Sequence, residues 1–259
     1  MRHPLVEKLL AVRDGGPFID EVPPTLKPRD VGEAYAIADD IVAALEVRWG
    51  PAVGYKIGAT STRGQQMLGL AEPFYGRAFA LRIMRGVARW DAAGGPYTIE
   101  AEVGFVLAHD LPPRPEPYTL AEVGDAVETV APLFEVNRPS FSRPFEVGGL
   151  CLIADNGVTQ GLAVNPAATP MHVLPDLAGE RVRMLHNGEV CAEGHAAAVL
   201  GNPLNALVWL ANALRAQRRG LRGGDIVASG AMTPPVPMVG GDVFAAEYTT
   251  LGRIDLQVI

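Results

Sequence analysis

The stretch IEAEVGFVL, residues 99–107, decides how this sequence is interpreted. Successive side chains of a β-strand point to opposite faces, so the apolar residues at the odd positions share one face. Glu100 and Glu102 share the other face, with Gly104 beside them. Two carboxylates at this spacing lie roughly 6.5–7 Å apart along a strand and can turn towards one divalent cation. A solvated outer face of an edge strand is the alternative that the spacing leaves open.

A third glutamate, Glu135, stands in the apolar segment APLFEVN, residues 131–137. Burying a carboxylate is costly unless it is paired or bound to a metal, although a side chain that points to water avoids that cost. Taken with Glu100 and Glu102, Glu135 predicts a hard-cation site with oxygen ligands, which suits Mg²⁺. The sequence holds no H-x-x-x-H motif or Cys/His cluster that would favour a softer metal.

Lys56 stands in the apolar, strand-like segment VGYKIG, residues 53–58, and the chain's other lysines are Lys8 and Lys27. A lysine in such a strand can neutralise a substrate carboxylate or transfer a proton with a lowered pKa. A surface lysine whose stem covers apolar neighbours is the alternative.

Two polar segments are further candidates for a binding site. Asp155-Asn156-Gly157 follows the apolar run 150–154 and predicts a turn that ends a strand, or a polar loop at the mouth of a site. The segment SGAMTPPVPM, residues 229–238, predicts a rigid turn. Three of its residues can be presented to a ligand, namely Ser229, Gly230 and Thr233.

The remaining pattern predicts an α+β protein. The chain has 259 residues, 48% of them hydrophobic, which is enough to bury a core in one or two domains. Apolar periodicity predicts helices over 4–13, over 31–48 and from Pro203 towards Gly220. Short apolar runs bounded by turn residues predict strands over 53–58, 99–107, 130–136, 224–229, 241–248 and 253–259, with a hairpin at Asn187-Gly188. Strands that do not alternate with helices favour an antiparallel or mixed sheet.

Composition excludes several function classes. The net charge is −7 and no run of Lys or Arg exceeds two residues, so nucleic acid is not an expected partner. Cys151 and Cys191 form no C-x-x-C motif, which argues against a zinc site or disulfide framework, and both are expected to be buried. No signal peptide and no uninterrupted run of about 18 apolar residues is present, so we expect no membrane partner and a cytoplasmic location.

Seven segments occur together in a characteristic order. They are GYKIGATS (54–61), EPFYG (72–76), IEAEVGFVL (99–107), VAPLFEV (130–136), ADN (154–156), EGHAAAVLGNPLNALVWLAN (193–212) and GDIVASGAMTPPVP (224–237). This set resembles the 2-keto-4-pentenoate hydratase and 4-oxalocrotonate decarboxylase family of the fumarylacetoacetate hydrolase superfamily. The resemblance extends from about residue 30 to the C-terminus.

The resemblance implies a mixed β-roll of the fumarylacetoacetate hydrolase type, with a mainly helical N-terminal part over residues 1–80 and a catalytic domain over 81–259. It implies Mg²⁺ or Mn²⁺, held by Glu100, Glu102 and Glu135. It places Lys56 in the active site, where we expect Asp155 as a second catalytic residue. We expect substrate contacts from Lys56 and from four polar-loop residues, namely Asn156, Ser229, Gly230 and Thr233.

The implied activity is that of a metal-dependent lyase on short, anionic 2-keto-enoates or 2-hydroxy-dienoates of aromatic meta-cleavage catabolism. The substrate would chelate the metal through its carboxylate and 2-oxygen. The resemblance also implies a homo-oligomer, able to associate with a related enzyme of the pathway.

One position departs from the hydratase pattern E-P-D-[YF]-G, because Phe74 stands where the aspartate is expected. That acid is implicated in handling the water or the proton, and an apolar residue removes it. A 2-keto-4-pentenoate hydratase is the first expectation and a 4-oxalocrotonate decarboxylase is the alternative. An acylpyruvate C–C hydrolase and a non-catalytic partner subunit are two further alternatives.

Overall fold

The computed structural model describes residues 2–173 and 176–259. The α-helices in these ranges are α1 (Pro4–Arg13), α2 (Val31–Trp49), α3 (Thr62–Leu68), α4 (Leu120–Asp125), α5 (Pro144–Val147), α6 (Gly149–Ala154) and α7 (Pro203–Ala216). The strands are β1 (Ala52–Gly58), β2 (Phe74–Phe79), β3 (Ile83–Arg85), β4 (Ala88–Trp90), β5 (Tyr97–Leu107), β6 (Val127–Asn137), β7 (Thr159–Val164), β8 (Thr169–Pro170), β9 (Arg181–His186), β10 (Glu189–His195), β11 (Ile226–Ala231), β12 (Val236–Met238), β13 (Val243–Tyr248) and β14 (Arg253–Val258).

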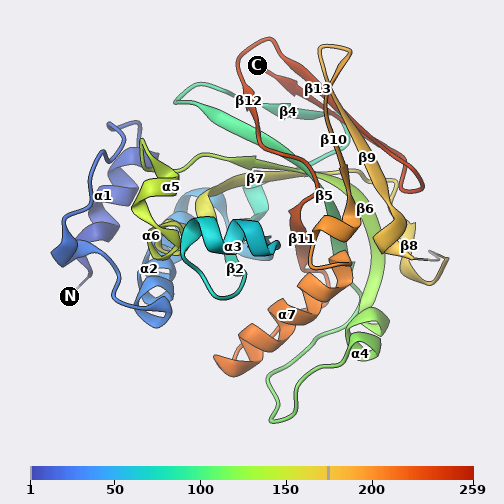
Figure 1. Ribbon diagram of the computed structural model, residues 1–259, viewed down its shortest axis with the longest axis horizontal. Coiled ribbons are helices and arrows are strands. Elements are labelled where there is room, and N and C mark those ends of the chain that lie inside the picture. Colours follow the sequence, from blue (N-terminus) through green and yellow to red (C-terminus); the bar gives the residue numbers. More distant parts are fainter. Residues whose placement is uncertain (1, 174–175) are drawn as a thin grey trace.

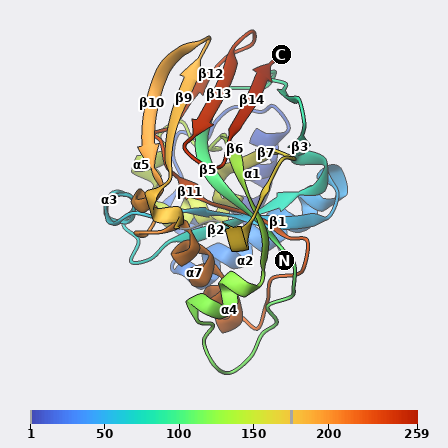
Figure 2. The same ribbon diagram turned by 90° about the vertical axis from the view of Figure 1, so that its right-hand side faces the viewer.

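The strands form two mixed sheets. The nine-stranded sheet has the order β2-β1-β11-β5-β6-β7-β3, with β12 paired to β5 and β8 paired to β6. The five-stranded sheet has the order β10-β9-β13-β14-β4, and Figure 2 shows β9, β10, β13 and β14 side by side above the larger sheet. The pairs β1–β11, β3–β7 and β14–β4 are parallel and the other pairs are antiparallel. The expectation of a mixed sheet in an α+β protein is therefore confirmed.

The N-terminal helices form a small core of their own. Leu5 and Leu9 of α1 pack with Ile41 and Leu45 of α2, and this cluster also contains buried residues of β2 and α6. Figure 1 shows α1, α2, α5 and α6 gathered on one side of the molecule, with α4 and α7 together at its lower end. Asp30 caps the N-terminus of α2, because its side chain accepts a hydrogen bond from the Glu33 backbone at 2.8 Å.

Two strands that precede the expected domain boundary at residue 80 belong to the large sheet. Gly54 of β1 pairs with Ile226 of β11, and β2 pairs with β1, so both strands belong to the large sheet. The nine-stranded sheet therefore begins at residue 52 of the sequence, directly after α2.

Several local predictions can be compared with the structure. Asn187 and Gly188 join β9 to β10 with φ values of +52° and +89°, which confirms the hairpin. The apolar run 150–154, which precedes the predicted turn, lies in the helix α6. The expectation for the cysteines holds for Cys151, which is buried, and is wrong for Cys191, which is exposed on the edge strand β10.

One segment, Ala196–Ala216, has the length and the mean hydropathy, 1.3, of a membrane-spanning helix. It includes α7, which buries a stripe of leucines in the main core, namely Leu204, Leu207, Leu210 and Leu214. A core helix of a globular protein has the same composition. The predicted apolar stripe of α7 therefore accounts for this hydropathy.

Candidate active site and metal centre

The antiparallel pairing of β5 with β6 brings the three glutamates together. Glu100 lies directly opposite Glu135, and Glu102 lies opposite Leu133. Carboxylate oxygens of Glu100, Glu102 and Glu135 all lie within 4.8 Å of one another. The period of two along each strand puts these side chains on one face, and the register sets Glu100 directly beside Glu135 with Glu102 two residues along β5.

Burial and mutual repulsion act on this cluster. Glu102 and Glu135 are each 1% exposed, and Glu100 is partly exposed. Burial, followed by the charge of Glu135, raises the pKa of Glu100 to about 7 and raises the pKa of Glu102 well above its usual range. A divalent cation would offset both the cost of burial and the repulsion between the carboxylates, because it would supply positive charge to groups that have lost water.

Two neighbouring groups orient the carboxylates. The Nδ2 atom of Asn137 donates to Glu100 and to Glu135, in both cases at 2.9 Å. The backbone N–H of Gly230 donates to Glu102 at 2.8 Å. Oε1 of Glu135 and Oδ1 of Asn137 are buried and accept no hydrogen bond from the described residues. Oε1 of Glu135 faces the Nζ atom of Lys56 at 3.3 Å as an ion pair. Buried oxygens that accept no hydrogen bond, in an all-oxygen cluster, fit a hard divalent cation such as Mg²⁺.

Lys56 lies beside this cluster and is 4% exposed. Its Nζ atom lies 3.3 Å from Oε1 of Glu135 and 5.4 Å from the centre of the Phe74 ring. Phe74, at the start of β2, covers the β1 backbone, because a Cβ atom at Gly58 would lie 2.4 Å from its ring. Lys56 is therefore a buried cation at the carboxylate cluster rather than a surface lysine.

A cavity of about 610 Å³ opens above these residues. Its polar floor contains Lys56 and the three glutamates, and Arg63 of α3 contributes a second cation to the lining. Much of the remaining wall is apolar and includes Met67, Leu68, Phe74, Phe145, Leu152 and Val158. The cavity therefore offers an anionic ligand two positive charges next to a carboxylate cluster.

The structure places the predicted polar-loop residues differently. The Asp155 carboxylate is fully buried and bonds Arg13 at 2.9 Å and the Ser140 backbone N–H at 2.7 Å, so it is not presented to the cavity. The Asn156 side chain bonds the backbone of Arg77. These contacts occupy the polar atoms that the sequence prediction assigned to catalysis and substrate binding.

Of the three residues predicted on the second polar segment, Thr233 lines the cavity, and its Oγ1 accepts a hydrogen bond from the Ala101 backbone at 3.1 Å. Ser229 is fully buried outside the lining, and Gly230 supports Glu102. Sequence reasoning missed Asn137 and Arg63. The signal for Asn137 was its position two residues after Glu135, on the same face of the strand.

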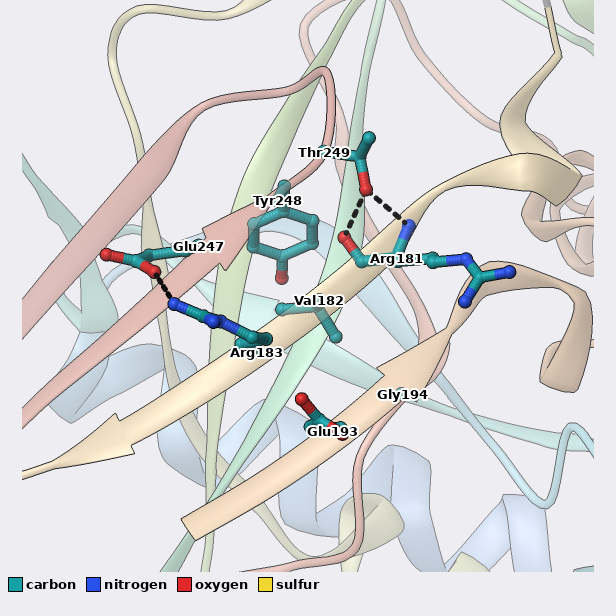
Figure 3. A pocket seen from close by; sticks show the side chains of 8 residues that line it. All are labelled: Arg181, Val182, Arg183, Glu193, Gly194, Glu247, Tyr248 and Thr249. Atoms are coloured by element: carbon teal, nitrogen blue, oxygen red, sulfur yellow. Dashed lines mark hydrogen bonds and ion pairs between the residues drawn. The ribbon is translucent and has the colours of Figure 1, made fainter. Parts of the chain in front are cut away.

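A second hollow, of about 390 Å³, lies on the five-stranded sheet and is shown in Figure 3. It contains none of the predicted site residues. Arg183 and Glu247 in its wall form an ion pair at 3.0 Å. The hydroxyl of Tyr248, also in the wall, donates to the carbonyl of Glu102 at 2.6 Å, so this residue supports β5, the strand that carries two of the three clustered glutamates.

Comparisons with known proteins agree with this geometry. Residues 65–259 match the model of the fumarylacetoacetate (FAA) hydrolase C-terminal family. A TodF product hydratase of Pseudomonas putida is 35% identical over 87% of this chain and 83% of the relative. A 2-keto-4-pentenoate hydratase of Paraburkholderia xenovorans is 33% identical over 98% of this chain and 93% of the relative.

Solved structures extend the likeness to the whole chain. The 4-oxalocrotonate decarboxylase of Pseudomonas putida G7, complexed with magnesium and adipate, has a TM-score of 0.90 at 26% identity and covers 100% of this chain and 98% of its own. A fumarylpyruvate hydrolase of Pseudomonas aeruginosa with Mn²⁺ and pyruvate has a TM-score of 0.61 at 14% identity, covers 79% of this chain and 88% of its own, and shows the fold alone. By sequence over nearly its full length, and by fold, the chain belongs to the fumarylacetoacetate hydrolase family of enzymes.

Proposed function

We propose that this chain is a divalent-metal-dependent lyase for short 2-keto-enoates, and that its reaction is hydration of the 2-keto-4-pentenoate type. The observation that carries the proposal is the cluster of Glu100, Glu102 and Glu135 with Lys56 3.3 Å from Glu135, on the floor of a cavity. A 2-keto acid presents a carboxylate and a ketone oxygen that together match a metal and one adjacent cation. Relatives named as hydratases, at 33–35% identity, support this choice.

The residues of the site have separable tasks. Glu100, Glu102 and Glu135 would hold the metal, which when bound polarises the 2-keto group of a chelating acid. Asn137 and Gly230 fix the directions of these carboxylates. The Lys56 ammonium adds positive charge beside the 2-oxygen and holds the proton that an enolate or dienolate exchanges. The apolar wall limits the water that reaches the reacting carbons.

Decarboxylation of 2-oxohex-3-enedioate is a second candidate, and the side chains around Lys56 favour it. Phe74 and Val158 line this part of the cavity in place of acid or base groups. Once a metal occupies the glutamates, Lys56 is the polar side chain of this part of the lining that remains to carry a proton. Hydration of 2-hydroxypenta-2,4-dienoate moves the enol proton to C5, and then adds the oxygen of water to C4 and a proton to C3. Decarboxylation of 2-oxohex-3-enedioate breaks the bond between C5 and the C6 carboxylate. The electron pair passes through the conjugated double bond to the 2-oxygen, which needs one proton.

Product analysis by NMR tests both reactions. Purified protein with Mg²⁺ is mixed with 2-hydroxypenta-2,4-dienoate and, separately, with 2-oxohex-3-enedioate. A 4-hydroxy-2-keto acid from the first substrate supports hydration, whereas CO₂ and 2-hydroxypentadienoate from the second support decarboxylation. No product from either substrate with Mg²⁺ or Mn²⁺ would overturn the lyase proposal.

Three expectations from the sequence analysis are retained as proposals. They are the roll arrangement of the two sheets, the cytoplasmic location, and a homo-oligomer that associates with a related pathway enzyme. Size-exclusion chromatography with light scattering tests the oligomer directly.

A further inference from the structure

We infer that the turn formed by residues 155–158 is a positioning element for Lys56. It holds the lysine stem from one side while Glu135 faces the ammonium at the other end. The inference rests on the proposed function only in treating Lys56 as the cation of the active site. It gives Asp155, Asn156 and Gly157 a role that acts through the lysine.

The backbone of this turn is strained. Asn156, Gly157 and Val158 have φ values of +53°, +63° and +63° in succession. Residues other than glycine rarely adopt this region, and a β-branched valine there is a true outlier. Strain of this kind persists only where the surroundings hold the chain in place, and it concentrates at functional sites.

Three parts of the fold hold the turn. Arg13 of α1 donates to both the carboxylate and the backbone carbonyl of Asp155, at 2.9 and 2.7 Å. Ser140, which follows β6, donates to the same carboxylate through its N–H at 2.7 Å and its Oγ at 2.8 Å. The Asn156 side chain accepts from the Arg77 N–H on β2 at 2.8 Å and donates to the Arg77 carbonyl at 3.0 Å.

The held turn touches Lys56 directly. A Cβ atom at Gly157 would lie 2.9 Å from Cε of Lys56 and 3.3 Å from the backbone nitrogen of Gly76. At Gly76 a Cβ atom would lie 2.3 Å from the carbonyl oxygen of Asn156, so the turn and β2 are in close contact. A lysine has a flexible four-carbon stem. The turn and the Phe74 ring together restrict the positions that this stem can take.

The chain's three lysines make the position of Lys56 measurable. Protein grown with [¹³Cε]lysine and loaded with Mg²⁺ gives three lysine signals, and Lys56→Met identifies the one from Lys56. We expect that signal to be displaced from those of Lys8 and Lys27, because the Phe74 ring lies 5.4 Å from Nζ.

The main test compares two glycine substitutions. Gly157→Ala places a methyl group against Cε of Lys56, whereas Gly86→Ala is a matched control with φ of +76° and nothing within 4 Å of the new Cβ atom. We expect Gly157→Ala to shift the Lys56 signal and lower kcat/KM about 100-fold, with Mg²⁺ affinity within about twofold of wild type. We expect Gly86→Ala to leave the signal and kcat/KM unchanged. A Gly157→Ala protein that loses thermal stability but keeps the Lys56 signal and kcat/KM would overturn the inference.

A second pair of variants serves if Gly157→Ala does not fold. Asn156→Asp keeps the acceptor for the Arg77 N–H and loses the donor to the Arg77 carbonyl, whereas Asn156→Ala loses both. We expect the Lys56 signal to shift in the order wild type, Asp, Ala. Unchanged signals in both variants would overturn the inference. The NMR readout needs no turnover, so the result stands even if the proposed lyase reaction fails its own test.

Discussion

The Nζ atom of Lys56 on β1 lies 3.3 Å from Oε1 of Glu135 on β6, although 79 residues separate them in the sequence. Both side chains are buried, so each charge depends on the other or on a metal for compensation. The pair joins the strand that carries the predicted acid/base group to a strand that carries a predicted metal ligand. Chemistry and metal binding are therefore expected to be separable by substitution.

Lys56→Met tests that separation. The change removes a positive charge beside the cluster, so we expect divalent-metal affinity to be equal to or tighter than wild type, while kcat/KM falls by about 10²–10⁴. Without metal, Glu135 is left buried and uncompensated, so we expect a loss of stability of about 3–5 kcal/mol that metal restores. Steady-state kinetics, calorimetric titration with Mn²⁺ and thermal unfolding measure the three quantities. Unchanged kinetics would return Lys56 to a structural role.

Glu102→Gln tests the metal centre. The amide keeps the size of the side chain but loses the charge, so we expect metal-dependent turnover to be abolished and Mn²⁺ binding to weaken strongly. Glu189→Gln on the exposed strand β10 is the control and is expected to have no effect. Full activity in the Glu102 variant would contradict the assignment of the cluster as a metal site.

Phe74→Asp tests which reaction the cavity favours. A carboxylate beside Lys56 supplies a second proton-transferring group, so we expect the ratio of hydration to decarboxylation to rise. Removing the ring also empties the space over Gly58, at a cost of about 3 kcal/mol in stability. Phe74→Leu loses ring volume without adding an acid and separates the two effects. An equal product ratio in both variants would show that this position does not select the reaction.

Metal affinity is expected to depend on pH near neutrality. In the metal-free protein the pKa of Glu100 is raised to about 7, and that of Glu102 is raised as well. Below pH 7 the metal must displace a proton, so the Kd for Mn²⁺ weakens by about tenfold per pH unit for each proton displaced. Above the pKa of both groups the Kd becomes constant. Titrations at pH 6, 7 and 8 measure the slope, and a Kd that is flat from pH 6 to 8 would contradict the expectation.

The grouping of the proposed metal ligands was predictable because a strand alternates strictly. Glu100 and Glu102 must share a face once IEAEVGFVL is a strand, and Glu135 interrupts an apolar run where a carboxylate is costly. The register that sets Glu100 opposite Glu135 was not predictable, since it depends on strand pairing across a loop of about 20 residues.

The turn at residues 155–158 shows what sequence patterns leave out. Asp155 and Asn156 are polar residues next to a glycine, which predicts a turn but not the direction of their side chains. Val158 has a positive φ, which β-branched residues disfavour, so the contacts that hold it there come from residues distant in sequence. The helix over 150–154 could not be read from the sequence, because a short apolar segment fits a buried strand and a buried helix equally well.

The position of β1 in the large sheet has a consequence for expression of partial chains. The family match begins at residue 65, which follows β1 and Lys56. A fragment cut at that residue would retain all three glutamates and lack the lysine. It would also remove β1 from beside β11, which leaves one side of β11 as an unpaired strand edge of the kind that promotes aggregation. The proposed active-site lysine and the protection of the β11 edge therefore depend on the same strand, and that strand lies upstream of the residues that match the family model.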